Sequence, residues 1–134
     1  MVPVVGPPGS GSLLDADGYE EQYLALVGPS WRNELDASIA LEVGGFRADR
    51  HAKNIAVPTL VQIADFDRGS PPHAAAKAAF AARAEVRHYP CDHFDVLPGN
   101  EWFDAAVMHE IGFLTRHLVG ASSAAPAQRS SGMR

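Results

Sequence analysis

The segment 59–89 constrains the fold most, because it joins two strand-like runs through one helix-like run. Residues 59–64 are apolar, rich in β-branched side chains and bounded by Pro58 and a turn cluster, which is typical of a strand buried on both faces. Residues 73–83 are dominated by alanine and predict a helix. Residues 85–89 alternate polar and apolar side chains, as a half-buried strand near a sheet edge does. A connection of this length allows the crossover that makes two strands parallel.

Helical spacing of apolar residues predicts further helices on both sides of this unit. It covers 19–27 and 31–43 before the first strand, and 101–118 after the second. The predicted fold class is therefore α/β, with helices in front of two parallel strands and their own helices. Two parallel strands do not bury themselves, since all-parallel sheets are normally covered on both faces. We therefore expect only part of a larger sheet.

Composition divides the chain into four segments. Residues 1–18 are rich in glycine, proline and serine and predict a flexible leader. Residues 121–134 are mostly alanine, serine, proline and glycine and predict a disordered tail. Between them, 19–54 form a helical segment and 55–120 form the α/β core.

The charge pattern limits the partners that we expect. The net charge is −5, and the eleven lysine and arginine residues are scattered, so neither nucleic acid nor an anionic membrane surface is an expected partner. No apolar run approaches the roughly 18 residues of a spanning helix. No secretory signal is visible at the N-terminus, and the single cysteine, Cys91, rules out an internal disulfide. We therefore expect a cytoplasmic protein.

Two loops carry the residues that best support chemistry. Asp67 lies three residues past the end of the first predicted strand, and His93 lies four residues past the end of the second. Functional groups collect at the carboxyl ends of parallel strands, which stand about 4.8 Å apart, so we expect these two side chains to come within hydrogen-bond reach. An aspartate on one ring nitrogen fixes the histidine tautomer and stabilises the imidazolium. We therefore predict an orienting role for Asp67 and a general-base role for His93, with Asp65 as the competing acid.

Several stretches between 55 and 118 also carry a likeness to a known family. They are Pro-Thr-Leu-Val-Gln-Ile-Ala-Asp-Phe-Asp-Arg-Gly-Ser-Pro-Pro at 58–72, the alanine-rich helix, Val-Arg-His-Tyr-Pro-Cys-Asp-His-Phe-Asp at 86–95, and the helix end Phe-Leu-Thr-Arg-His-Leu at 113–118. Together they resemble the C-terminal third of an α/β-hydrolase. That family carries its acid in a Gly-x-x-Asp-x-x-x-Pro loop, to which 64–71 is similar with Ala64 replacing the glycine. The resemblance implies a partial α/β-hydrolase sheet with Asp67 as acid and His93 as base, preceded by a cap-like helical segment at 19–54.

The nucleophile of that family has no counterpart in this chain. The motif Gly-x-Ser-x-Gly is absent, and its near-match at 28–32 has Arg32 in place of the second glycine. We interpret Ser30 as a helix N-cap rather than a nucleophile. The resemblance thus implies a truncated, esterase-like hydrolase fragment, inactive alone, whose complete form hydrolyses a small-molecule ester or similar acyl substrate without a cofactor.

Other interpretations of the same residues remain open. The chain is alternatively a non-catalytic interaction module that pairs with itself or a partner through an exposed sheet edge, which predicts a homo-oligomer and no esterase activity. A metal site at Asp92, His93 and Asp95 is not expected, because the spacing does not make ligands converge. Cys91 is expected to be a buried or half-buried, inert thiol.

Overall fold

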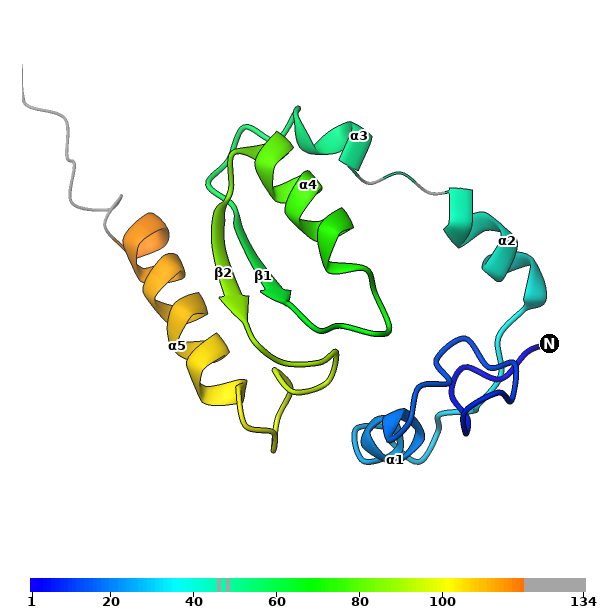
Figure 1. Cartoon of the computed structure of the whole chain (residues 1–134). Coiled ribbons are helices and arrows are strands. Elements are labelled where there is room, and N and C mark those ends of the chain that lie inside the picture. Colours follow the sequence, from blue (N-terminus) through cyan, green and yellow to red (C-terminus); the bar gives the residue numbers. More distant parts are fainter. Residues whose placement is uncertain (46, 48, 120–134) are drawn as a thin grey trace, which may run out of the picture.

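The computed structural model describes residues 1–45, 47 and 49–119, and it has a mixed α/β architecture (Figure 1). The predicted tail at 121–134 lies outside these residues. In chain order the elements are α1 (Tyr19–Leu24), α2 (Ala37–Gly45), α3 (Asp49–Ala52), β1 (Leu60–Ala64), α4 (Pro72–Ala82), β2 (Glu85–Tyr89), α5 (Phe103–Leu114) and a π-helical turn (Thr115–Val119). The predicted α/β class is confirmed.

The sheet consists of β1 and β2, which pair in parallel with Leu60 opposite Glu85 and Ala64 opposite Tyr89. The strand, helix and strand fall where the alternation of apolar and alanine-rich runs predicts them. Alternate side chains of a strand point to opposite faces. Val61 and Val86 therefore share one face of the sheet.

Helices α4 and α5 cover opposite faces of this sheet. On the α4 face, Ile63 is buried and α4 contributes the buried Ala79. On the other face, the side-chain amide of Gln62 donates to the backbone carbonyl of Ala106 in α5 (2.8 Å), and Tyr89 packs in the same apolar cluster as Ala106. Each face thus has one helix to bury against.

Strand β1 was expected to be buried on both faces, and this expectation is only partly correct. Ile63 is buried with 3% exposure, whereas the other four residues of the strand are half-buried. The physical reason is the width of the sheet, because two strands leave room for only one row of helix contacts on each side. Within the described residues, the sheet holds no third strand to cover the outer edge of β1.

The N-terminal residues fold against the region around α1. Val2 pairs with Leu35 and Val5 pairs with Leu14 in isolated bridges. The Asn33 side chain accepts hydrogen bonds from the amides of Val4 and Val5 (2.9 and 3.0 Å). Val5 is fully buried in a cluster with two aromatic residues, Tyr19 and Phe94. These contacts attach residues 1–18 to the fold, while the flexibility inferred from their composition stays a prediction.

The helices of the N-terminal segment differ from the predicted ranges. Helix α1 ends at Leu24, three residues before the predicted end, and α2 begins at Ala37 rather than at Trp31. The carboxylate of Asp36 accepts a hydrogen bond from the amide of Ser38 (2.9 Å), which is the contact of a helix N-cap. The N-cap prediction for Ser30 is therefore wrong, because this residue lies in an exposed turn and Asp36 caps the helix.

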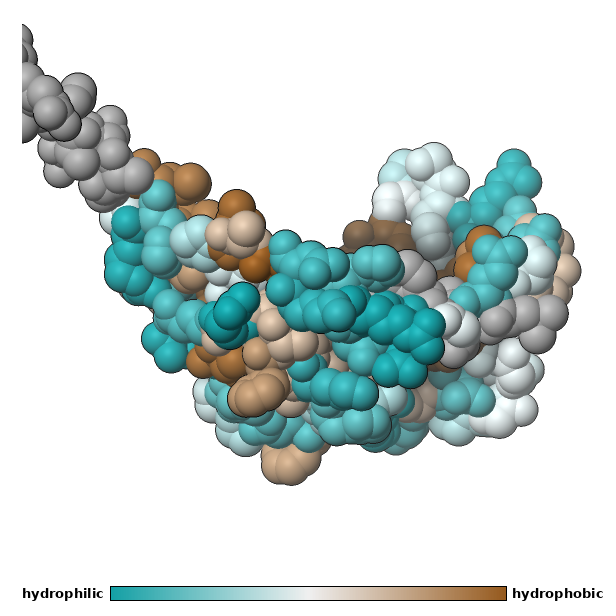
Figure 2. All heavy atoms as spheres, turned by 90° about the horizontal axis from the view of Figure 1, so that it is seen from above, coloured by the Kyte–Doolittle hydropathy of each residue, from teal (hydrophilic) through white to brown (hydrophobic). Residues whose placement is uncertain are grey.

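Several large apolar side chains remain on the surface along the chain, including Phe80 of α4, Met108 of α5 and Leu118 of the π-helical turn. Phe80 is 87% exposed, and Met108 and Leu118 are 67% and 69% exposed. Figure 2 shows apolar side chains near the last described residues. Within the residues that the structure describes, no helix has the length and apolar character to cross a membrane. The cytoplasmic location stays a prediction.

Candidate functional site

The structure brings the side chains of Asp67 and His93 into direct contact. The Nδ1 atom of His93 lies 3.0 Å from Oδ1 and 2.9 Å from Oδ2 of Asp67. The parallel register of β1 and β2 causes this meeting, since each residue lies on the loop that leaves the carboxyl end of its strand. The pair is partly shielded, with side-chain exposures of 13% for Asp67 and 31% for His93. The catalytic roles of the two residues stay a prediction.

A tight turn after β1 orients the Asp67 carboxylate. The amide of Asp67 donates to the carbonyl of Ala64 (3.3 Å), which closes the turn. The amides of Gly69 and Ser70 both donate to Oδ1 of Asp67 (2.8 and 2.6 Å). Pro71 then ends the loop and Pro72 begins α4, where proline is well tolerated. The carboxylate is therefore held by its own loop before it contacts the histidine.

The contact with Asp67 fixes the chemical state of the His93 ring. A carboxylate only accepts hydrogen bonds, so Nδ1 carries the proton and Nε2 carries a lone pair when the ring is neutral. Among the described residues, Nε2 has no hydrogen-bond partner. The rings of Tyr19 and Phe94 lie 5.9 and 4.8 Å from the His93 ring, between centroids, and limit its movement. This arrangement leaves one basic nitrogen directed away from the acid and available to a ligand.

Asp92 joins the loops of the pair through hydrogen bonds that the sequence did not predict, although it directly precedes His93. Its Oδ1 accepts hydrogen bonds from the hydroxyl of Tyr19 (2.5 Å) and from the amides of Arg68 (2.9 Å) and His93 (2.8 Å). Its Oδ2 accepts from Nε of Arg68 (2.6 Å) and lies 2.5 Å from Nη2 of the same side chain. One carboxylate thus joins helix α1, the loop after β1 and the loop after β2.

This network changes the acidity of its members. Burial alone raises the pKa of Asp92, but hydrogen bonds from Tyr19, Arg68 and His93 outweigh it and lower the pKa to about 2. For Tyr19, burial and then the hydrogen bond to Asp92 raise the pKa of the hydroxyl well above its usual value. Asp92 is therefore a carboxylate, and Tyr19 a hydroxyl donor, over the ordinary pH range.

The competing acid, Asp65, is bound to a different histidine. Nδ1 of His88 lies 2.6 Å from Oδ1 of Asp65. This second pair is more exposed than the first, with 53% of the His88 side chain and 39% of the Asp65 side chain accessible. In the described part of the chain, no backbone amide holds the Asp65 carboxylate. The structure therefore associates His93 with Asp67 and not with Asp65.

Cys91 lies near the site and is buried, as predicted. It is 5% exposed, and burial followed by the nearby carboxylates raises the pKa of its thiol to about 11. A thiol with this pKa holds very little thiolate at neutral pH. Within the described ranges, no group of three or more His, Cys, Asp or Glu side chains is arranged to hold a metal ion.

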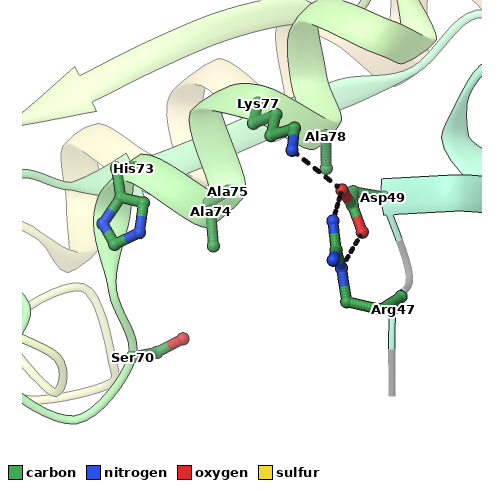
Figure 3. A pocket seen from close by; sticks show the side chains of 8 residues that line it. All are labelled: Arg47, Asp49, Ser70, His73, Ala74, Ala75, Lys77 and Ala78. Carbon is green, nitrogen blue, oxygen red and sulfur yellow. Dashed lines mark hydrogen bonds and ion pairs between the residues drawn. The ribbon is translucent and has the colours of Figure 1, made fainter. Parts of the chain in front are cut away.

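A hollow of about 460 Å³ opens beside the loop that carries Asp67 (Figure 3). Ser70 and His73 lie on one side of it, and Figure 3 shows Asp49 on the other side between Arg47 and Lys77. Arg47 donates two hydrogen bonds to Asp49 (2.8 and 2.6 Å), and Nζ of Lys77 lies 3.4 Å from the same carboxylate. These charges therefore neutralise one another in part and tie α3 to α4.

Fold and site together define a mixed α/β chain with a partly shielded Asp–His pair at the carboxyl end of a parallel sheet. The chain is 30% identical over 119 residues to the quorum-quenching protein AidA of Acinetobacter baumannii (strain MDR-ZJ06). The match covers 87% of this chain and 39% of AidA, so the chain spans about two fifths of the length of that relative. No family model and no solved structure matches the chain.

This comparison overturns the resemblance to an α/β-hydrolase. The relative is named for quorum quenching and not for hydrolysis, and no family model identifies a hydrolase. The predictions of a truncated, esterase-like hydrolase fragment and of acyl hydrolysis in a complete form are therefore wrong. The loop pattern at 64–71 and the histidine after the second strand are too short to define a family. These two loops define only a local geometry, in which adjacent strand ends bring Asp67 and His93 together.

Proposed function

We propose that the chain takes part in quorum quenching, with Asp67 and His93 as the acid–base pair that acts on a signal molecule. The observation that carries the proposal is the contact between the two side chains at 2.9 Å, with Nε2 of His93 left open. The similarity to AidA over 87% of this chain supports quorum quenching as the process.

The proposed chemistry starts with a proton transfer. Nε2 of His93 accepts a proton from the bound signal molecule, and the ring becomes an imidazolium. The carboxylate of Asp67 stabilises that cation through Nδ1, in the role that an aspartate has in catalytic triads. The amides of Gly69 and Ser70 keep the carboxylate in place during the transfer. A positioned general base of this kind contributes about 10²- to 10⁴-fold in rate.

The experiment measures the loss of signal molecules in the presence of the purified chain. An acyl homoserine lactone and an alkyl quinolone serve as probes of two chemical classes. Mass spectrometry follows the intact signal and any product, while a reporter bacterium follows its biological activity. The variants are His93→Gln and Asp67→Asn. The matched control is His88→Gln, because His88 also contacts an aspartate through Nδ1 but is more exposed.

The expected result is conversion of one probe by the wild-type chain, reduced about 10²-fold or more in His93→Gln. Asp67→Asn is expected to reduce it as well, and His88→Gln to leave it within about twofold of the wild type. Equal conversion by His93→Gln would remove the acid–base role. A silenced reporter with fully recoverable signal would mean sequestration, which contradicts the proposed chemistry. No effect on either probe or reporter counts against quenching by this chain.

A further inference from the structure

We infer that Asp92 is the positioning residue for His93. The inference rests on the proposed function in one respect only, namely that His93 is the working base. Asp92 binds the backbone amide of His93, while Asp67 binds its side chain. The amide of His93 donates to Asp92 (2.8 Å), and Nδ1 of His93 contacts Asp67 (2.9 Å). The histidine is thereby fixed at both ends by a carboxylate.

The same carboxylate also sets the position of the acid loop. Arg68 follows Asp67 in the chain, and both its amide and its guanidinium bind Asp92 (2.9 and 2.6 Å). A shift of Asp92 therefore moves the loops of the acid and of the base together. Because one carboxylate binds both loops, the distance between Asp67 and His93 stays constant when that carboxylate moves. Two separate attachment points would let the loops move independently.

Helix α1 reaches the site through this carboxylate as well. The Tyr19 hydroxyl donates to Asp92 (2.5 Å), and its ring lies 5.9 Å from the His93 ring and 5.1 Å below the Arg68 guanidinium. Tyr19 is 1% exposed and shields that side of the imidazole. The hydrogen bond to Asp92 thus places the ring that limits access of water to the pair.

The chemistry of these contacts requires a carboxylate at position 92. Every partner is a donor: one hydroxyl, two amides and a guanidinium. An asparagine presents one acceptor oxygen and one NH₂ group, and the NH₂ group then faces donors. Asp92→Asn keeps the size of the side chain and removes the charge and half of the acceptors. It is therefore the variant that isolates the positioning role.

The test measures the Nδ1 proton of His93 by NMR on the full ¹⁵N-labelled chain. A proton held between an imidazole and a carboxylate resonates far downfield and exchanges slowly with water. Asp67→Asn assigns the resonance by abolishing it. In Asp92→Asn we expect its exchange with water to rise about tenfold or more, since hydrogen bonds to charged groups are the stronger ones. Asp65→Asn is the matched control and is expected to leave the rate unchanged.

Circular dichroism separates a positioning role from a loss of fold. If Asp92→Asn is folded and the His93 proton exchanges as in the wild type, Asp92 is only an anchor for α1 and the inference fails. If Asp92→Asn does not fold, Tyr19→Phe decides, because it removes one donor and keeps the ring and the carboxylate. Faster exchange of the His93 proton in Tyr19→Phe supports the inference, and an unchanged rate overturns it. The readout needs no turnover, so failure of the quenching assay does not affect it.

Discussion

Protonation of Asp92 should make the fold sensitive to acid. Burial raises the pKa of this carboxyl, but the donors around it lower the pKa to about 2, against an ordinary value near 3.8. A carboxyl whose pKa is lower in the folded chain stabilises the fold above the unfolded pKa. That stabilisation is lost as the pH falls from about 4 towards 2. With 19% of the side chain exposed, solvent screening is modest.

The size of the effect follows from the two pKa values. Each tenfold difference in proton affinity corresponds to about 1.4 kcal/mol, so the charged Asp92 contributes about 2 kcal/mol to the free energy of unfolding at pH 5. At pH 2.5 the same group contributes less than about 1 kcal/mol. The wild type should therefore lose more stability than Asp92→Asn over this range, by about 1 to 2 kcal/mol.

Urea unfolding at pH 5 and pH 2.5, followed by circular dichroism, measures this difference. Both chains carry the same other carboxyls, so subtracting one free energy from the other isolates the contribution of position 92. Urea is uncharged and leaves the electrostatic interactions unscreened. If the gap between wild type and Asp92→Asn is the same at both pH values, Asp92 is not a carboxylate held by these donors, and the argument for its lowered pKa fails.

Three further substitutions test the packing around the site. Tyr89→Phe removes the buried hydroxyl to which the Gln62 side chain donates (2.9 Å). Urea unfolding should show that the free energy of unfolding falls by about 1–3 kcal/mol. A decrease within error would mean that the Gln62 amide binds water instead. Gly69→Ala places a methyl carbon 3.2 Å from Cγ of His93. We expect the free energy of unfolding to fall by about 1–3 kcal/mol in the same assay. An unchanged stability would show that the His93 ring moves freely. Gly112→Ala fills a helical position of α5 at ordinary contact distance, and the melting temperature should rise with a gain of about 0.5–1 kcal/mol, whereas a decrease would contradict the helix geometry.

The sequence predicts the parallel unit because every signal for it is local. The apolar run of β1, the alanines of α4 and the alternation in β2 each span fewer than a dozen residues. Once the two strands are parallel, Asp67 and His93 must leave the sheet at the same end. The closeness of the pair thus follows from topology rather than from any motif.

The rest of the site could not be predicted, because its contacts join distant parts of the chain. Tyr19 and Asp92 are 73 positions apart, and no periodicity in the sequence links them. Tyr19 also begins a helix of six residues, too short to show a clear apolar face. The predicted N-cap at Ser30 failed for a related reason. Side chains with an oxygen atom often precede apolar runs, so several residues fit the N-cap pattern. The backbone conformation brings the amide of Ser38 to the Asp36 carboxylate, and Asp36 therefore caps α2.

The two aspartate–histidine pairs differ in the physical features that the proposed role of a general base requires. Both pairs form at adjacent strand ends, through Nδ1, at distances of 2.6 and 2.9 Å, so distance does not distinguish them. Asp65 and His88 are exposed, and pairs in water contribute little and rearrange easily. Asp67 is held by two amides, and His93 is held at its own amide by Asp92. A base needs one tautomer and one orientation at the moment of proton transfer, and of these two pairs Asp67–His93 is the one whose hydrogen bonds maintain both. The difference between His88→Gln and His93→Gln therefore measures preorganisation rather than the mere presence of an aspartate beside a histidine.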